Sequence, residues 1–152
     1  MAMSLSFSAA IDEWVKETEA RMNAVFRESA RRIISLSQEY IVGLDAIDTG
    51  FMRGSVTVSL SSMPKIDPAK TEGLPGGEEY VLQIAGARIG QTIYAGYTAA
   101  YSRHVHDGTS KMAGRPYIYL AALQWPRVVY EVSQELKGRV TRANLDRAFG
   151  RG

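Results

Sequence analysis

The sequence predicts an α+β fold in a single domain that spans residues 1–152. Three observations predict it: a helical stripe of apolar residues near the N-terminus, a short segment of alternating apolar and polar residues, and a second helical stripe toward the C-terminus. We therefore expect a long N-terminal helix, a small antiparallel sheet of three to four strands, and a C-terminal helix packed on one face of that sheet.

The first stripe runs from about residue 8 to residue 42, and neither glycine nor proline interrupts it before Gly43. Apolar or small residues recur every three or four positions, which is typical of one face of an amphipathic helix. An unbroken helix of this length spans roughly 52 Å. A small domain cannot bury such a stripe unless the helix packs lengthwise on the domain or against another subunit.

Strands are expected in the middle of the chain. Residues 55–61 alternate strictly, which predicts a half-buried strand, and further strands are expected at about residues 80–87 and 91–97. Because these strands are short and sequential, we expect an antiparallel meander. The intervening residues 62–79 hold three prolines and three glycines, which predicts a long mobile loop.

The second stripe covers residues 117–149 and predicts the C-terminal helix. Pro116 suits the start of a helix, since the missing N–H group of proline is not needed there. Pro126 cannot donate a backbone hydrogen bond, so it is expected to kink or divide the helix. Residues 150–152 form a short tail that we expect to be frayed.

Composition and charge narrow the possible functions. The chain has no cysteine, which excludes disulfides and thiolate chemistry, and no apolar run approaches the ~20 residues of a membrane span. Residues 1–50 hold 5 Lys/Arg and 8 Asp/Glu, a net charge of −3, whereas residues 98–152 hold 9 and 4, a net charge of +5. The basic segment suits either DNA or an acidic protein surface, including the acidic segment of another copy.

The segment 104-HVHD-107 holds both histidines of the chain. In a strand, His104 and His106 would share one face and could bind a metal ion, with Asp107 pointing away from both. On a helix the two histidines would diverge. The sequence contains no further histidine, no cysteine and no recognised nucleotide-binding or nucleophile motif, so we expect no cofactor and no catalytic site.

Tyrosines gather between residues 94 and 119, where five of the eight lie. Tyrosine combines a large apolar ring with a polar tip and is enriched in protein interfaces. The cluster therefore predicts either an interface or an aromatic face of the sheet.

Two stretches resemble the motifs of a known family. The first, 48-DTGFMRGSV-56, is similar to the family's entry into its first strand. The second, 94-YAGYTAAYSRHVHDGTSKMAGRPYIYLAAL-123, is similar to a block in which a Gly-Thr pair, a methionine and an Arg-Pro pair keep a fixed spacing. The family comprises the minor tail or tail-completion (neck) proteins of long-tailed bacteriophages and related gene-transfer particles. The resemblance covers roughly residues 45–152. The chain departs from the pattern at His106, where the family has glutamate, and at His104, where it has tyrosine.

The resemblance implies a non-enzymatic structural protein of the virion, assembled in the cytoplasm of the bacterial host. Such proteins form a ring, usually six-fold, that completes the tail and joins it to the DNA-filled head. The implied partners are further copies of the chain and the neighbouring neck, head-closure and tail-tube proteins, with non-specific contact to DNA in the lumen and no membrane. A ring needs two different complementary patches on each copy, and the acidic and basic segments offer such a pair.

Six residues of the matching motifs are expected to form the interface with other copies or partners. These residues are Arg53, His104, His106, Lys111, Met112 and Arg115. Three alternatives remain open: a tail terminator that caps growth of the tail tube, a DNA-binding accessory protein that uses residues 98–152, and a small metal-dependent hydrolase that uses His104, His106 and Asp107.

Overall fold

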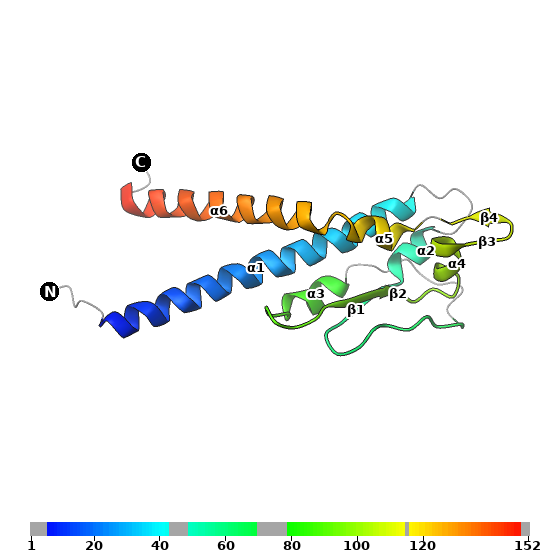
Figure 1. The fold of residues 1–152 in the computed structure, drawn as a ribbon, viewed down its shortest axis with the longest axis horizontal. Helices are drawn as coiled ribbons and strands as arrows, with labels where there is room; N and C mark the ends of the chain where they lie inside the picture. The colour runs from blue at the N-terminus through cyan, green and yellow to red at the C-terminus, as the bar shows by residue number, and fades with distance from the viewer. Residues whose placement is uncertain (1–5, 43–48, 70–78, 115, 150–152) are drawn as a thin grey trace.

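Helix α1 is the longest element of the fold, and α2, α3, α5 and α6 pack against it (Figure 1). The structure is a computed structural model that describes residues 6–42, 49–69, 79–114 and 116–149. In chain order the elements are α1 (Phe7–Val42), α2 (Thr49–Gly54), β1 (Val56–Ser59), α3 (Glu79–Ala85), β2 (Tyr94–Tyr97), α4 (Ser102–Asp107), β3 (Gly108–Thr109), β4 (Met112–Ala113), α5 (Tyr117–Ala122) and α6 (Trp125–Phe149). The predicted α+β class is confirmed.

The long N-terminal helix is also confirmed. Its first turn is capped by Ser6, whose side-chain oxygen accepts a hydrogen bond from the backbone N–H of Ala9 at 3.3 Å. Such a cap satisfies one of the N–H groups that a helix start leaves without an intrahelical partner. The second half of α1 carries buried residues, among them Ala30, Ile34 and Ile41. The first half extends past the packed body (Figure 1).

The sheet is smaller than expected. Strands β1 and β2 pair antiparallel, with Val56 opposite Tyr97 and Ser59 opposite Tyr94. Strands β3 and β4 form a separate hairpin of two residues each. The described residues therefore hold two two-stranded sheets rather than one sheet of three to four strands. Residues 70–78 of the expected loop, like residues 150–152, lie outside the described part of the chain.

The strand expected at residues 80–87 is wrong, because this segment forms helix α3. Tyr80 and Ile84 are buried, whereas Leu82 is 77% exposed. A spacing of four residues places Tyr80 and Ile84 on one face of a helix. In a strand, Leu82 would have shared their face and would also have required burial.

The C-terminal helix is divided as predicted. Helix α5 ends at Ala122, and α6 begins at Trp125, with Pro126 in its first turn. In this position proline leaves no intrahelical hydrogen bond unmade. Pro116 is the residue directly before α5, and its carbonyl oxygen accepts a hydrogen bond from Leu120 N–H at 2.9 Å.

The position of the C-terminal helix differs from the expectation. We expected it on a face of the sheet, but α6 packs chiefly against α1, and Figure 1 shows α1 between α6 and the layer of α3, β1 and β2. Val128 and Val132 of α6 are buried. Because one side of α1 faces the sheet layer, α6 packs on the opposite side of α1.

One hydrophobic core joins these layers. It draws on α1, α2, α3, α4, α5 and both strands of the larger sheet. Its buried members are Ala30, Ile34, Ile41, Met52, Val56, Val58, Tyr80, Ile84, Tyr97, Ala99, Val105 and Tyr117. Val105 anchors α4 in this core, while the candidate site residue His104 of the same helix is exposed.

Candidate functional site

The segment 104-HVHD-107 is helical, so the extended geometry considered for a metal site does not occur. Residues two apart on a helix point in different directions. His104 is exposed, whereas the ring of His106 packs edge-on against Tyr117, with 5.2 Å between the ring centroids. The two histidines therefore do not form the paired ligands that a metal-dependent hydrolase would use.

The carboxylate of Asp107 is held by its neighbours in α4. His106 Nδ1 lies 2.9 Å from Asp107 Oδ1, and Arg103 Nε donates to Asp107 Oδ2 at 3.3 Å. The hydrogen bond from His106, followed by that from Arg103, lowers the pKa of Asp107. Among the described residues, no group of three or more His, Cys, Asp or Glu side chains could hold a metal ion.

A hollow of about 300 Å³ opens beside α4. Its lining is mostly apolar, and α4 contributes the polar side chains of Ser102, Arg103, His106 and Asp107. The lining residues are Met63, Pro64, Ile66, Gly96, Tyr97, Ser102, Arg103, His106, Asp107, Tyr117 and Ile118. An apolar hollow with a few polar groups can receive an apolar side chain of another protein.

The two tyrosines of this hollow, Tyr97 and Tyr117, are structural. Their rings meet edge-on, with 5.1 Å between centroids. The hydroxyl groups of Tyr97 and Ser37 lie 2.7 Å apart, and the hydroxyl of Tyr117 donates to the carbonyl oxygen of Ser102 at 3.0 Å. Burial raises the pKa of both tyrosines. The tyrosine cluster in the sequence signalled this aromatic packing, but its hydroxyl partners could not be identified from sequence.

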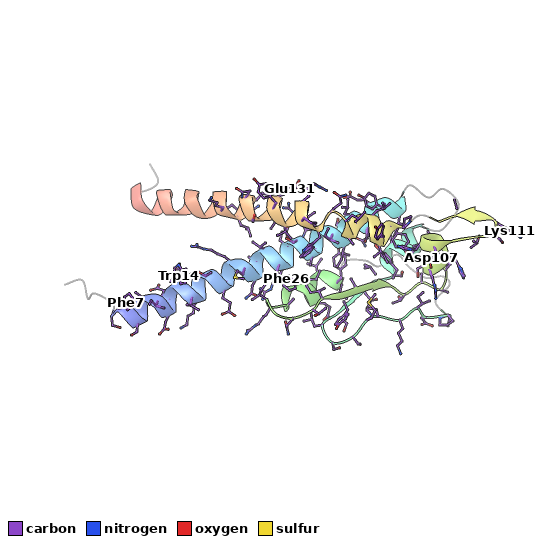
Figure 2. The ribbon with its side chains drawn as sticks, in the orientation of Figure 1. Phe7, Trp14, Phe26, Asp107, Lys111 and Glu131 are labelled. Atoms are coloured by element: carbon purple, nitrogen blue, oxygen red, sulfur yellow. The ribbon has the colours of Figure 1, made fainter. Side chains whose placement is uncertain are left out.

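The β3–β4 hairpin carries Lys111 at the end of the molecule opposite the N-terminus of α1 (Figure 2). The hairpin depends on two glycines. Gly108 adopts φ 87° where α4 ends, a conformation that favours glycine. Gly114 passes so close to α4 that an added Cβ would lie 2.5 Å from the backbone carbonyl carbon of Asp107.

The other expected interface residues are placed as follows. Arg53 is an exposed residue of α2, and its carbonyl oxygen accepts a hydrogen bond from Gln38. Met112 lies in β4, but its side chain is not described. Arg115 lies outside the described residues. The structure thus brings His104, His106 and Lys111 to one end of the molecule.

The two sequence motifs meet in the structure. The carbonyl oxygen of Ser55 accepts hydrogen bonds from the backbone N–H and the hydroxyl of Thr98, at 3.1 and 3.0 Å. The hydroxyl of Ser55 accepts a further bond from Ala99 N–H. The motif at residues 48–56 and the block that begins at residue 94 therefore form one folded unit, which fixes α2 against the start of α4.

A second candidate surface lies at the other end of the molecule. The first part of α1, residues 7–22, extends past the packed body, and we call it the arm (Figure 2). Phe7 is 82% exposed and Trp14 is 66% exposed, and Ile11, Val15 and Met22 are also exposed. Contiguous apolar surface of this kind marks sites of interaction. The length of the stripe was the signal in the sequence, since it exceeds what a small domain can cover.

Comparisons with models of protein families, with curated proteins and with solved structures found no match to this chain. No helix in the described part of the chain is long and apolar enough to cross a membrane.

Proposed function

We propose that the protein is a non-enzymatic structural component of a phage neck, which forms a ring that completes the tail and joins it to the DNA-filled head. The observation that carries this proposal is the arm. Large apolar side chains that stand in water along a projecting helix are costly for a monomer and favourable for a subunit that buries them on assembly. The choice of the phage neck as the assembly rests on the resemblance of the two motifs to neck proteins.

The two unlike ends of the molecule support a ring. The arm end presents exposed apolar residues such as Phe7 and Trp14, and the hairpin end presents the exposed cations Arg103 and Lys111. The arm end therefore offers a surface for a neighbouring copy, and the hairpin end stays available for other partners. In a ring, a surface of one copy meets a different surface of the next copy, and such contacts close when the rotation between copies permits.

The cationic end also suits the lumen of such a ring. Lysine and arginine side chains bind phosphate oxygens without reading the base sequence, so they tolerate any DNA that passes. We place this end near the DNA path or at a neighbouring neck protein, in a virion that is assembled in the host cytoplasm.

Deletion of the gene from its phage or element of origin tests the proposal directly. Negative-stain electron microscopy of the particles should then reveal filled heads separate from tails of normal length. Over-long or ragged tails would instead indicate a terminator of tube growth. Normal, joined particles would contradict a neck function.

A charge reversal tests the cationic end. Lys111→Glu should lower the yield of joined particles while the purified protein keeps its circular dichroism spectrum. Arg88→Glu is the matched control, because Arg88 is an exposed cation on the loop that follows α3. Equal effects of the two substitutions would contradict an interface at Lys111.

A further inference from the structure

The apolar residues of the arm continue the face of α1 that meets α6. Met22, Val25, Ser29 and Arg32 follow one another at intervals of three or four residues, so they share one face of the helix. In the packed body, Ser29 is fully buried and Arg32 Nη2 binds Glu135 Oε2 of α6 at 2.6 Å. Toward the N-terminus this row reaches the arm.

The same row in the arm holds exposed apolar side chains. Ile11, Val15 and Thr18 precede Met22 at the same intervals of three and four residues. Val15 is 48% exposed and Met22 is 49% exposed. The row that meets α6 at Arg32 is therefore exposed to solvent in the arm.

Helix α6 separates from α1 near the place where the arm begins. Beyond the Arg32–Glu135 contact, α1 and α6 diverge, and their free ends lie apart within one copy (Figure 1). We call residues 137–149 the distal part of α6. Residues 7–22 span about 24 Å and residues 137–149 span about 20 Å of helix. The two segments therefore match in length.

Their charges are complementary. The arm holds Asp12, Glu13, Glu17 and Glu19 against Lys16 and Arg21, a net charge of −2. The distal part of α6 holds Lys137, Arg139, Arg142 and Arg147 against Asp146, a net charge of +3. Two arms would repel each other and so would two distal parts of α6, whereas an arm and a distal part of α6 attract.

We infer that the arm of one copy packs along the distal part of α6 of a second copy. This contact continues between copies the α1–α6 pairing that exists within each copy, and it covers the apolar row where the helices diverge. The inference rests on the proposed function in taking self-assembly as given, and it names the surfaces that meet. A heterologous contact of this kind repeats from copy to copy, as a ring requires.

Disulfide trapping between single-cysteine variants tests the contact, because the chain has no native cysteine. Val15→Cys and Arg139→Cys proteins are mixed under a mild oxidant, so that a cross-link between the two positions must join two copies. We expect a covalent heterodimer as the main product on a non-reducing gel, identified by mass spectrometry of the linked peptides.

Ala20→Cys provides the matched control. Ala20 is an exposed residue of the arm that lies roughly 140° around the helix from Val15. Its mixture with Arg139→Cys should give little heterodimer. Equal cross-linking of both mixtures, preferential arm-to-arm cross-linking of Val15→Cys, or no heterodimer would each overturn the inference.

Charge reversal supplies a second test in the full-length protein. Asp12→Lys/Glu19→Lys, added to the Val15→Cys protein, reverses the arm at two residues that lie within about 60° of Val15 around the helix. Arg142→Glu/Arg147→Glu, added to the Arg139→Cys protein, reverses the distal part of α6 at two residues within about 80° of Arg139. Either reversal alone should remove most of the cross-link, because like charges then face each other. The two reversed proteins mixed together should recover it. Failure of this recovery would overturn the inference.

The trapping result and the gene deletion fail independently. If the heterodimer forms while deletion leaves normal particles, the contact stands and the neck function falls. If deletion separates heads from tails but no heterodimer forms, the neck function stands and the inferred contact falls.

Discussion

Arg32 and Glu135 lie 103 residues apart in the sequence and are joined by two hydrogen bonds, of 3.0 and 2.6 Å. This paired geometry between a guanidinium and a carboxylate ties α1 to α6 where the two helices begin to diverge. Arg32 also donates to Glu28 of its own helix at 2.9 Å. The contact therefore joins the two helices near the point where the arm leaves the body.

Glu135→Gln should lower the midpoint of urea unfolding, because the neutral amide weakens the ion pair that joins α1 to α6. Glu131→Gln is the control, since Glu131 pairs with Arg127 within α6. An exposed pair within one helix contributes little. A midpoint for Glu131→Gln as low as that for Glu135→Gln would contradict a role of the Arg32–Glu135 contact in stability.

Acid should destabilise the protein in part through Glu28. The hydrogen bond from Arg31, with a further one from Arg32, lowers the pKa of Glu28 to about 2 from 4.5. The unfolded chain therefore binds a proton at this group before the folded chain does. The stabilising contribution is complete above about pH 4.5 and is lost as the pH falls toward 2.

Glu28→Gln should remove this part of the pH dependence. At neutral pH it should cost ~1 kcal/mol of unfolding free energy, since solvent screens a group that is about a third exposed. Thermal unfolding of both proteins across the acidic range measures the difference. Parallel curves for the wild type and the variant would contradict the assignment.

Gly114→Ala should destabilise the hairpin end by ~2 kcal/mol, because the new Cβ would meet the backbone of Asp107 and Gly108 at 2.5 to 2.7 Å. Gly138→Ala is the opposite case. No atom lies within 4 Å of a Cβ at Gly138 in α6, so alanine should stabilise the helix by ~1 kcal/mol. Urea unfolding measures both, and a neutral Gly114→Ala would show that the close approach is not required.

Tyr97→Phe should cost ~1 kcal/mol, because it removes the buried hydrogen bond between the hydroxyls of Tyr97 and Ser37. Burial also raises the pKa of Tyr97 above its ordinary value of 10.0. The unfolded chain ionises first as the pH rises, so stability should fall above about pH 10. Tyr130→Phe is the control, since Tyr130 is 66% exposed, and an equal cost for both would contradict the prediction.

The sequence predicted correctly those elements whose apolar spacing fits either a helix or a strand, but not both. The rows of α1 and the alternation around Val56 and Val58 each fit one structure, and Pro126 marked the division between α5 and α6. The strand expected at residues 80–87 was wrong because Tyr80 and Ile84, four residues apart, share a face both in a strand and in a helix. Packing chose the helix by burying Ile84 and leaving Leu82 in solvent.

The candidate site was predicted in part for the same reason. The motif selected His104, His106 and Lys111 as interface residues, and the structure places all three at the hairpin end of the molecule. The sequence left open a short helix or a loop at the position of α4, because six residues carry too weak a periodic signal on their own. Its geometry depends on contacts from distant segments, including the bond from the Tyr117 hydroxyl to the carbonyl oxygen of Ser102.

The sequence by itself determined the α+β class, the long first helix and its excess of apolar residues, since these follow from local periodicity and length. Only the tertiary structure decided which part of the stripe is covered. Ser29 and Ile34 are buried by the body, whereas Trp14 is left in solvent because α6 diverges from α1 beyond the Arg32–Glu135 contact. Burial depends on which segments meet in space, and a one-dimensional pattern does not contain that relation.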